Sequence, residues 1–144
     1  MITSDEAALV WPVVAQVALT AVVWVLLYVA RLGEMSRRGI DPQRVADSRL
    51  AAGVLENVAA ADNFRNLFEV PVLFYAVVPL LIFVHAASPT ALVLAWAFVA
   101  LRAVHSLIHL TYNRVVHRFA AYALGTLCVF GLWAVLALAL WRRF

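Results

Sequence analysis

Four polar residues precede an apolar run in the stretch DNFRNLFEVPVLF, which covers residues 62–74. At about 100° per helical residue, Asp62, Arg65, Asn66 and Glu69 fall on one face of a helix. Ionisable groups in or beside hydrocarbon are costly and are usually functional. The spacing therefore predicts a functional polar face. The alternative is a structural face with Asp62–Arg65 and Arg65–Glu69 ion pairs, each worth about 0.2–0.5 kcal/mol.

Two later segments carry polar rows with helical spacing of their own. The first row has the spacing i, i+3, i+7, i+10 and consists of Arg102, His105, His109 and Tyr112. The second row has the spacing i, i+4, i+7 and consists of Arg118, Tyr122 and Gly125. Residues three and four apart on a helix are neighbours, so each row forms one face.

These residue types suit a charged ligand of small size. An arginine stays charged and prefers carboxylates or thiolates, whereas Asn66 and the tyrosines offer directional hydrogen bonds. A neighbouring arginine also lowers the pKa of a thiol from about 8.5 toward neutrality. The predicted ligand is a small zwitterion with extra carboxylates, or a thiol.

Two of these features have alternative interpretations. His105 and His109, at i and i+4, could bind a metal, but no third ligand of suitable spacing stands out apart from Glu69, and no metal is predicted. Arg118 could instead be an anchor at the membrane interface, with its stem in apolar surroundings and its head in water.

The composition requires that the solvent is partly lipid. Hydrophobic residues make up 66% of the 144-residue chain, against about 45–50% in soluble domains. The single cysteine excludes an intrachain disulfide and a cysteine-based metal cluster. The net charge of +3 comes mostly from scattered arginines, which predicts contact with anionic membrane lipid and not with nucleic acid.

Three apolar segments are long enough to cross about 30 Å of hydrocarbon. The second apolar run, at 70–84, covers only about 22 Å, so its span must include the polar residues before it. The sequence therefore predicts an all-α fold, a four-helix bundle in the membrane that forms a single domain. The predicted spans cover residues 8–31, 62–85, 89–112 and 117–141, with a loop at 32–61. Ser88 and Pro89 are suited to the N-cap and first residue of the third helix, and Pro71 and Pro79 predict kinks in the second.

Four spans place both chain ends on one side of the membrane, and the positive-inside rule then sets the orientation. Seven arginines lie on or near the loop side, namely Arg31, Arg37, Arg38, Arg44, Arg49, Arg114 and Arg118, against Arg142 and Arg143 on the side of the termini. The 32–61 loop is therefore predicted to be cytoplasmic. The three polar rows then lie at the same depth, which predicts one shared pocket near the cytoplasmic surface. The N-termini of the second and fourth helices face this pocket and favour an anion there.

Three short motifs resemble a known family, the membrane-associated proteins in eicosanoid and glutathione metabolism (MAPEG). RNLFE at 65–69 is similar to the family's Arg-Asn-x-x-Glu, RAVH at 102–105 to its Arg-x-x-His, and RFAAY at 118–122 to its Arg-x-x-x-Tyr. The chain looks most like the bacterial branch, and it is similar to the microsomal glutathione transferases. It departs from the pattern at His109, where the family places a tyrosine, and at Asp62, where some members carry a basic residue.

The resemblance implies a homotrimer in a bacterial inner membrane that binds glutathione between neighbouring subunits. By position, Arg118 would be the catalytic residue and would stabilise the glutathione thiolate. The residues that would contact this cofactor are Arg31, Arg65, Asn66, Glu69, His105, His109, Tyr112 and Tyr122. The implied reaction is transfer of glutathione to a small lipophilic electrophile from the bilayer, or reduction of a lipid hydroperoxide.

Two other functions stay open from the sequence. A non-catalytic member of the family would use the same pocket to bind a lipid or a partner. A proton or solute conductor would use Glu69, His105 and His109 as a relay, but the apolar far half of the spans offers no continuing polar path.

Overall fold

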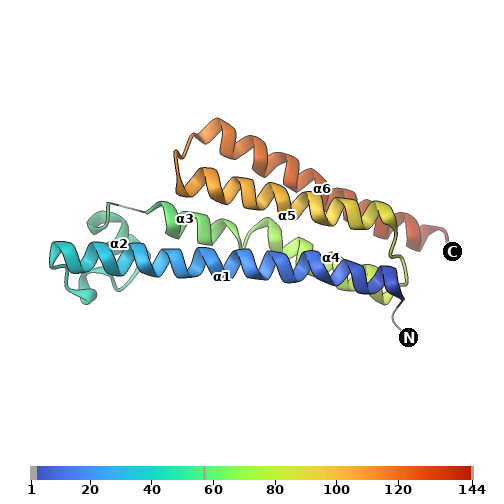
Figure 1. The fold of residues 1–144 in the computed structure, drawn as a ribbon, viewed down its shortest axis with the longest axis horizontal. Helices are drawn as coiled ribbons and strands as arrows, with labels where there is room; N and C mark the ends of the chain where they lie inside the picture. Colours follow the sequence, from blue (N-terminus) through green and yellow to red (C-terminus); the bar gives the residue numbers. More distant parts are fainter. Residues whose placement is uncertain (1–2, 57, 144) are drawn as a thin grey trace.

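The computed structural model describes residues 3–56 and 58–143, and within these ranges it consists of helices and connecting segments without strands. The helices are α1 (Ser4–Arg38), η1 (Pro42–Val45), α2 (Ser48–Val54), α3 (Ala59–Asn66), α4 (Val70–Phe83), α5 (Pro89–Leu110) and α6 (Val115–Trp141). The long ones run side by side, with both chain ends at one end of the bundle and α2 at the other (Figure 1). Four helical segments are long and apolar enough to cross a membrane, namely Ser4–Arg38, Ala59–Phe83, Pro89–Leu110 and Val115–Trp141. The predicted all-α, four-helix membrane bundle is confirmed.

Local sequence explains where α1 begins and ends. Its first turn is a capping box, in which Glu6 N donates to Thr3 Oγ1 at 3.3 Å and Thr3 N donates to the Glu6 carboxylate at 2.7 Å. The helix runs through Gly33 and ends only at Gly39, whose φ of +60° is the left-handed conformation that glycine adopts readily. The helix therefore continues past residue 31, where the predicted span ends.

The starts of α5 and α6 agree with the sequence patterns. Ser88 Oγ accepts a hydrogen bond from Ala91 N at 3.2 Å, and Pro89 is the first residue of α5. Proline suits this position because its missing N–H would have no partner inside the helix. The fourth spanning helix begins at Val115, two residues before the predicted start of the span at residue 117.

The second spanning segment is interrupted, and this changes the polar face predicted from it. α3 ends at Asn66 and α4 begins at Val70. Pro71 causes the interruption, because it cannot donate to a carbonyl one turn earlier and its ring clashes with that carbonyl. Glu69 adopts φ −92° and ψ −101°, which is not helical. It therefore lies off the helical face that carries Asp62, Arg65 and Asn66.

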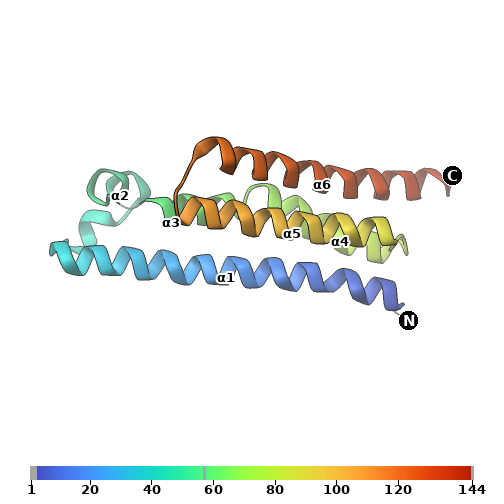
Figure 2. The ribbon, with the colours of Figure 1, turned by 45° about the horizontal axis from the view of Figure 1, so that its top comes forward.

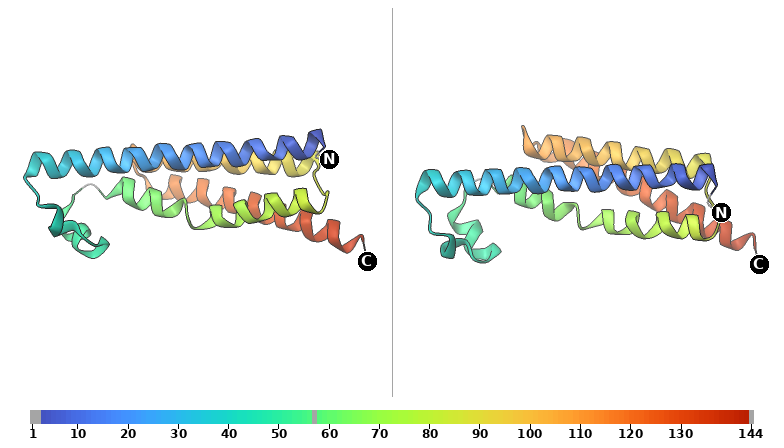
Figure 3. Two further views of the ribbon diagram at one scale, coloured as in Figure 1. Left: turned by 90° about the horizontal axis from the view of Figure 1, so that it is seen from below. Right: turned by 60° about the horizontal axis from the view of Figure 1, so that its bottom comes forward.

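α5 is the central helix of the bundle and contacts α1, α3 and α6. Figure 2 shows α6 on one side of α5 and α1 on the other, and Figure 3 shows α1 as one continuous helix beside the interrupted α3–α4 segment. Phe74 of α4 and Phe98 of α5 stack in the core with ring centroids 4.7 Å apart. The rest of the core is aliphatic and includes Leu9, Val77, Leu81, Ala91, Ala95, Val129 and Leu132. This apolar part supports the polar ends of α5 and α6.

Large apolar side chains remain exposed on the outside of the single protomer. They occur on every spanning helix and include Trp11, Phe83, Val93, Phe119 and Trp141, each at least 65% exposed. A surface of this kind is stable against hydrocarbon or against another protein chain, but not against water.

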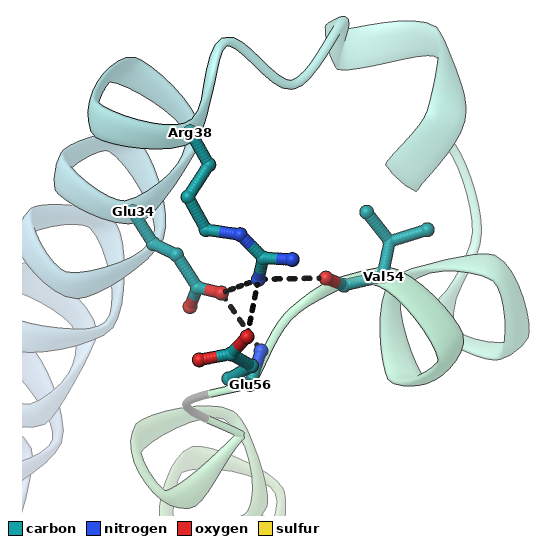
Figure 4. A network of polar contacts seen from close by, with 4 residues as sticks. All are labelled: Glu34, Arg38, Val54 and Glu56. Atoms are coloured by element: carbon teal, nitrogen blue, oxygen red, sulfur yellow. Dashed lines mark hydrogen bonds and ion pairs between the residues drawn. The ribbon is translucent and has the colours of Figure 1, made fainter.

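A buried carboxylate fastens the loop between α1 and α3, as Figure 4 shows. The Glu34 side chain accepts from Arg38 Nη1 at 2.6 Å and from Glu56 N at 2.7 Å, and Glu34 is only 5% exposed. Arg38 Nη1 also donates to the Val54 carbonyl at 3.0 Å. These bonds tie the C-terminal part of the loop to the last turns of α1.

We expect Glu34→Ala to loosen this loop. The substitution removes two hydrogen bonds that involve a charged group, each worth about 1.5–3 kcal/mol, so local opening should become at least about tenfold more frequent. Limited trypsin digestion, followed at Arg44 and Arg49 in the exposed part of the loop, measures this rate.

Glu56→Ala is the matched control for the loop experiment. The Glu56 side chain is 83% exposed and lies 3.4 Å from Arg38, a geometry that contributes little. Equal digestion rates for the two variants would show that Glu34 does not hold the loop.

Candidate functional site

Arg118, in the first turn of α6, is held by two acceptors from the end of α5 and the turn after it. Its Nη1 donates to Asn113 Oδ1 at 2.7 Å and to His109 Nε2 at 3.0 Å. A guanidinium only donates, so His109 Nε2 must be the acceptor, and the proton of the neutral imidazole sits on Nδ1. In this protomer, His109 therefore holds the Arg118 side chain by accepting a hydrogen bond from it.

The backbone carbonyl of Arg118 fixes the orientation of the His105 ring. Its Nδ1 lies 3.0 Å from the Arg118 carbonyl oxygen, which can only accept, so Nδ1 carries the proton. The ring is 2% exposed and packs 6.0 Å from the Tyr122 ring, measured between centroids. Nε2 of His105 is buried and has no hydrogen-bond partner among the described residues, which makes it an available acceptor.

Arg102 is the most unusual charged group of the site. It is 1% exposed, and its guanidinium lies between two aromatic rings, 4.9 Å from the centroid of Tyr122 and 5.6 Å from that of Phe98. None of its three nitrogens has a hydrogen-bond partner in the described part of the chain. Glu69 interacts with it electrostatically. Burying a cation without acceptors is expensive, so Arg102 is suited to an anion from outside the protomer.

A cavity of about 200 Å³ opens beside these groups. Its lining residues are Asn66, His105, Val115, Arg118, Phe119 and Tyr122. Pockets for small molecules usually measure about 300–1,000 Å³. The cavity thus offers a cation, an amide and a phenol beside apolar side chains, but it is smaller than a complete ligand site.

The structure brings together only part of the residue set predicted from the sequence. Asn66, His105, Arg118 and Tyr122 line the cavity, and His109 contacts Arg118. Four others lie outside it, namely Arg31, Arg65, Glu69 and Tyr112. The roles of all nine in binding or catalysis stay predictions.

The four outlying residues face other surroundings in the single protomer. Arg65 is exposed and pairs with Asp62 at 3.4 Å, while Glu69 is exposed at the break between α3 and α4. The Tyr112 hydroxyl lies 3.2 Å from Nδ1 of His117, away from the cavity. Arg31 is partly buried on α1.

Two asparagines that the sequence analysis did not single out take part in the site. Asn63 Oδ1 accepts from Ser106 Oγ at 3.1 Å, and both residues are buried, which ties α3 to α5. Asn113 has φ +47° in the turn before α6, a conformation in which asparagine is enriched. That preference, in a turn one step after a polar helical row, was the only signal in the sequence for Asn113.

The described residues hold no group of three or more His, Cys, Asp or Glu side chains placed to bind a metal ion. His105 and His109 have ring centroids 5.8 Å apart. Each uses one ring nitrogen for the contacts to Arg118 given above.

Fold and site together define a class: helical, multi-pass membrane proteins with a basic polar site at one end of the bundle. The sequence profile of the MAPEG family matches residues 9–138, and the chain therefore belongs to the MAPEG family. This confirms the family predicted from the three motifs. No curated protein and no solved structure matched the chain significantly.

Proposed function

We propose that this protein is a glutathione-dependent transferase or peroxidase that acts within the membrane on lipophilic electrophiles or lipid hydroperoxides. Membership of the MAPEG family supports a role in glutathione chemistry. The observation that carries the proposal is the placement of Arg118, a cation beside a partly apolar cavity, whose side-chain partners are both uncharged.

The chemistry of the donors fits glutathione. This ligand carries two carboxylates, an amine, two amides and a thiol. Asn66 can bind amide groups, Tyr122 can donate to a carboxylate, and the buried Arg102 has no acceptor in the described part of the chain. Such orphaned donors are the groups that an anionic ligand satisfies.

The residues of the site would divide the work in the following way. Glutathione supplies a thiol as the reacting group. Arg118 stabilises negative charge on that sulfur, an effect that is large where water is excluded. His105 presents its unprotonated Nε2 as a hydrogen-bond acceptor, and Tyr122 is held by the cation–π contact with Arg102.

We further propose a homotrimer, as membership of the MAPEG family implies, and the same observations support sites that neighbouring subunits share. The cavity of one protomer is small, and Arg31, Arg65, Glu69 and Tyr112 lie outside it. A neighbouring copy that covers the exposed apolar helices could add to the cavity and bring these residues to the ligand. For the assembly we propose a bacterial inner membrane, with the 32–61 loop on the cytoplasmic side and both termini on the other, following the arginine distribution.

Thiolate formation in the purified protein tests the proposal. Adding glutathione to the protein in detergent at neutral pH should produce the ultraviolet absorbance of a bound thiolate, with about one thiolate or fewer per subunit. Native mass spectrometry of the same sample should give the mass of three chains.

The alternative function is a non-catalytic membrane protein that binds a lipid or a partner. The observation that favours it is that Arg65 and Glu69, two charged residues predicted to hold glutathione, do not line the cavity of the protomer. If the assembled protein gives no thiolate absorbance and no measurable glutathione binding, the result supports this alternative.

A further inference from the structure

Among the residues that the structure describes, the side chains that anchor Arg118 carry no charge. Asn113 and His109 both accept from the same nitrogen, Nη1, at 2.7 and 3.0 Å. Because His109 accepts through Nε2 from a donor that never loses its proton, it must be neutral in this arrangement. The two contacts fix the direction of the guanidinium and leave its formal charge of one unit intact.

The two carboxylates nearest to this part of the site interact with residues other than Arg118. Asp62, on the neighbouring α3, pairs with Arg65 at 3.4 Å and also interacts electrostatically with His109. Glu69 interacts with the buried Arg102. Among the described residues, no carboxylate forms an ion pair with Arg118. A carboxylate in place of either acceptor would attract Arg118 more strongly, but it would also cancel the field that Arg118 exerts on a ligand.

We propose that Asn113 and His109 are positioning residues that hold Arg118 through uncharged acceptors, so that its positive charge stays available to a bound thiolate. This inference rests on the proposed function, since it concerns the ionisation of the thiol at the same site. It assigns Asn113 and His109 the same role, which is to orient the Arg118 side chain without contacting the ligand.

The backbone at Asn113 makes a sharp test possible. Asn113 adopts φ +47°, and its N–H donates to the Ile108 carbonyl at 2.8 Å. Aspartate tolerates this left-handed conformation and glycine adopts it freely. Asn113→Asp and Asn113→Gly should therefore both keep the turn. The first retains the acceptor and adds a charge, whereas the second removes the acceptor and adds none.

The two roles that Asn113 could have predict opposite orders for these variants. If Asn113 only anchors the Arg118 side chain, the aspartate variant should resemble the wild type or exceed it, because a charge-assisted bond to Arg118 is stronger. The glycine variant, which loses that bond, should then be the weaker one. If charge preservation matters, the aspartate variant is the more impaired. An opposite charge at this distance, screened at the partly exposed site, should reduce the thiolate fraction at neutral pH by about three- to tenfold.

The experiment measures the ultraviolet absorbance of glutathione thiolate as a function of pH for the wild type and both variants, in the assembled protein at saturating glutathione. We expect the thiolate fraction to fall in the order wild type, Asn113→Gly, Asn113→Asp. If the thiolate fraction of the aspartate variant equals or exceeds that of the glycine variant, the positioning inference is wrong, but the proposed function still stands. The wild type is measured first. If it forms no thiolate, the proposed function itself is wrong, and this result is distinct from any difference between the variants.

Discussion

Arg118→Ala should abolish thiolate formation while leaving the protein folded. Arg118 provides the cation beside the cavity, and removing one such group from a preorganised site costs about 2.7–4 kcal/mol. Turnover with a lipophilic electrophile should fall by about 100- to 1,000-fold. The apparent pKa of bound glutathione should return toward about 8.5, the value of a free thiol. Spectrophotometric titration of the bound thiol measures the second effect independently of the acceptor substrate.

Arg114→Ala is the matched control for this experiment, because it removes the same charge from the residue just before α6. Arg114 is exposed and makes no capping hydrogen bond through its side chain. The Arg118 variant loses its bonds to His109 and Asn113, which together account for a stability loss of about 1–3 kcal/mol. If the two variants retain equal thiolate absorbance, Arg118 acts only as an anchor at the membrane interface.

The helices could be predicted from the sequence because their signals are local. The capping pair Ser88–Pro89 fixed the start of α5, and four apolar runs gave the number of spanning segments. The end of α1 was less predictable. Both Gly33 and Gly39 could end a helix, yet α1 continues through Gly33 and ends before Gly39. A glycine in a sequence permits a helix end but does not require one.

The polar face on the second spanning segment shows where periodicity stops being informative. The spacing of Asp62, Arg65, Asn66 and Glu69 assumes a continuous helix, but the break before Pro71 rotates Glu69 off that face. Asn63, one residue from the predicted row, is the residue that is fully buried against α5. Which side of a short amphipathic helix faces inward depends on packing, and the helical period alone does not contain that information.

The site on α5 and α6 followed the sequence more closely, because these two helices are uninterrupted and a short turn joins them. Tyr112 is the exception in its row, since α5 ends at Leu110 and Tyr112 lies in the turn. His105, His109, Arg118 and Tyr122 meet as the spacing predicts. Arg102 belonged to the same row, but its burial between two aromatic rings comes from the approach of α6 to α5. Asn113 was missed because it lies in the turn, where helical spacing has no meaning.

Arg102→Met should separate stability from binding. The substitution replaces a buried cation that has no hydrogen-bond partner in the described chain with an apolar side chain of similar length. Replacing poorly compensated buried charge with apolar groups is often neutral or stabilising. Without glutathione, the thermal midpoint of unfolding should therefore be unchanged or higher.

With glutathione, the same variant should lose the benefit of the ligand. Ligand at about 100 times its Kd stabilises a protein by about 2.7 kcal/mol, so the wild-type midpoint should rise and the Arg102→Met midpoint should not. Two losses combine here, since the cation that suits an anionic group is gone and Tyr122 is no longer positioned by its contact with the Arg102 guanidinium. Arg114→Met, which changes an exposed arginine in the same way, should respond to glutathione like the wild type. A large drop in stability with ligand binding retained would mean that Arg102 supports the fold, and that the acceptor for its guanidinium is supplied by the assembled protein.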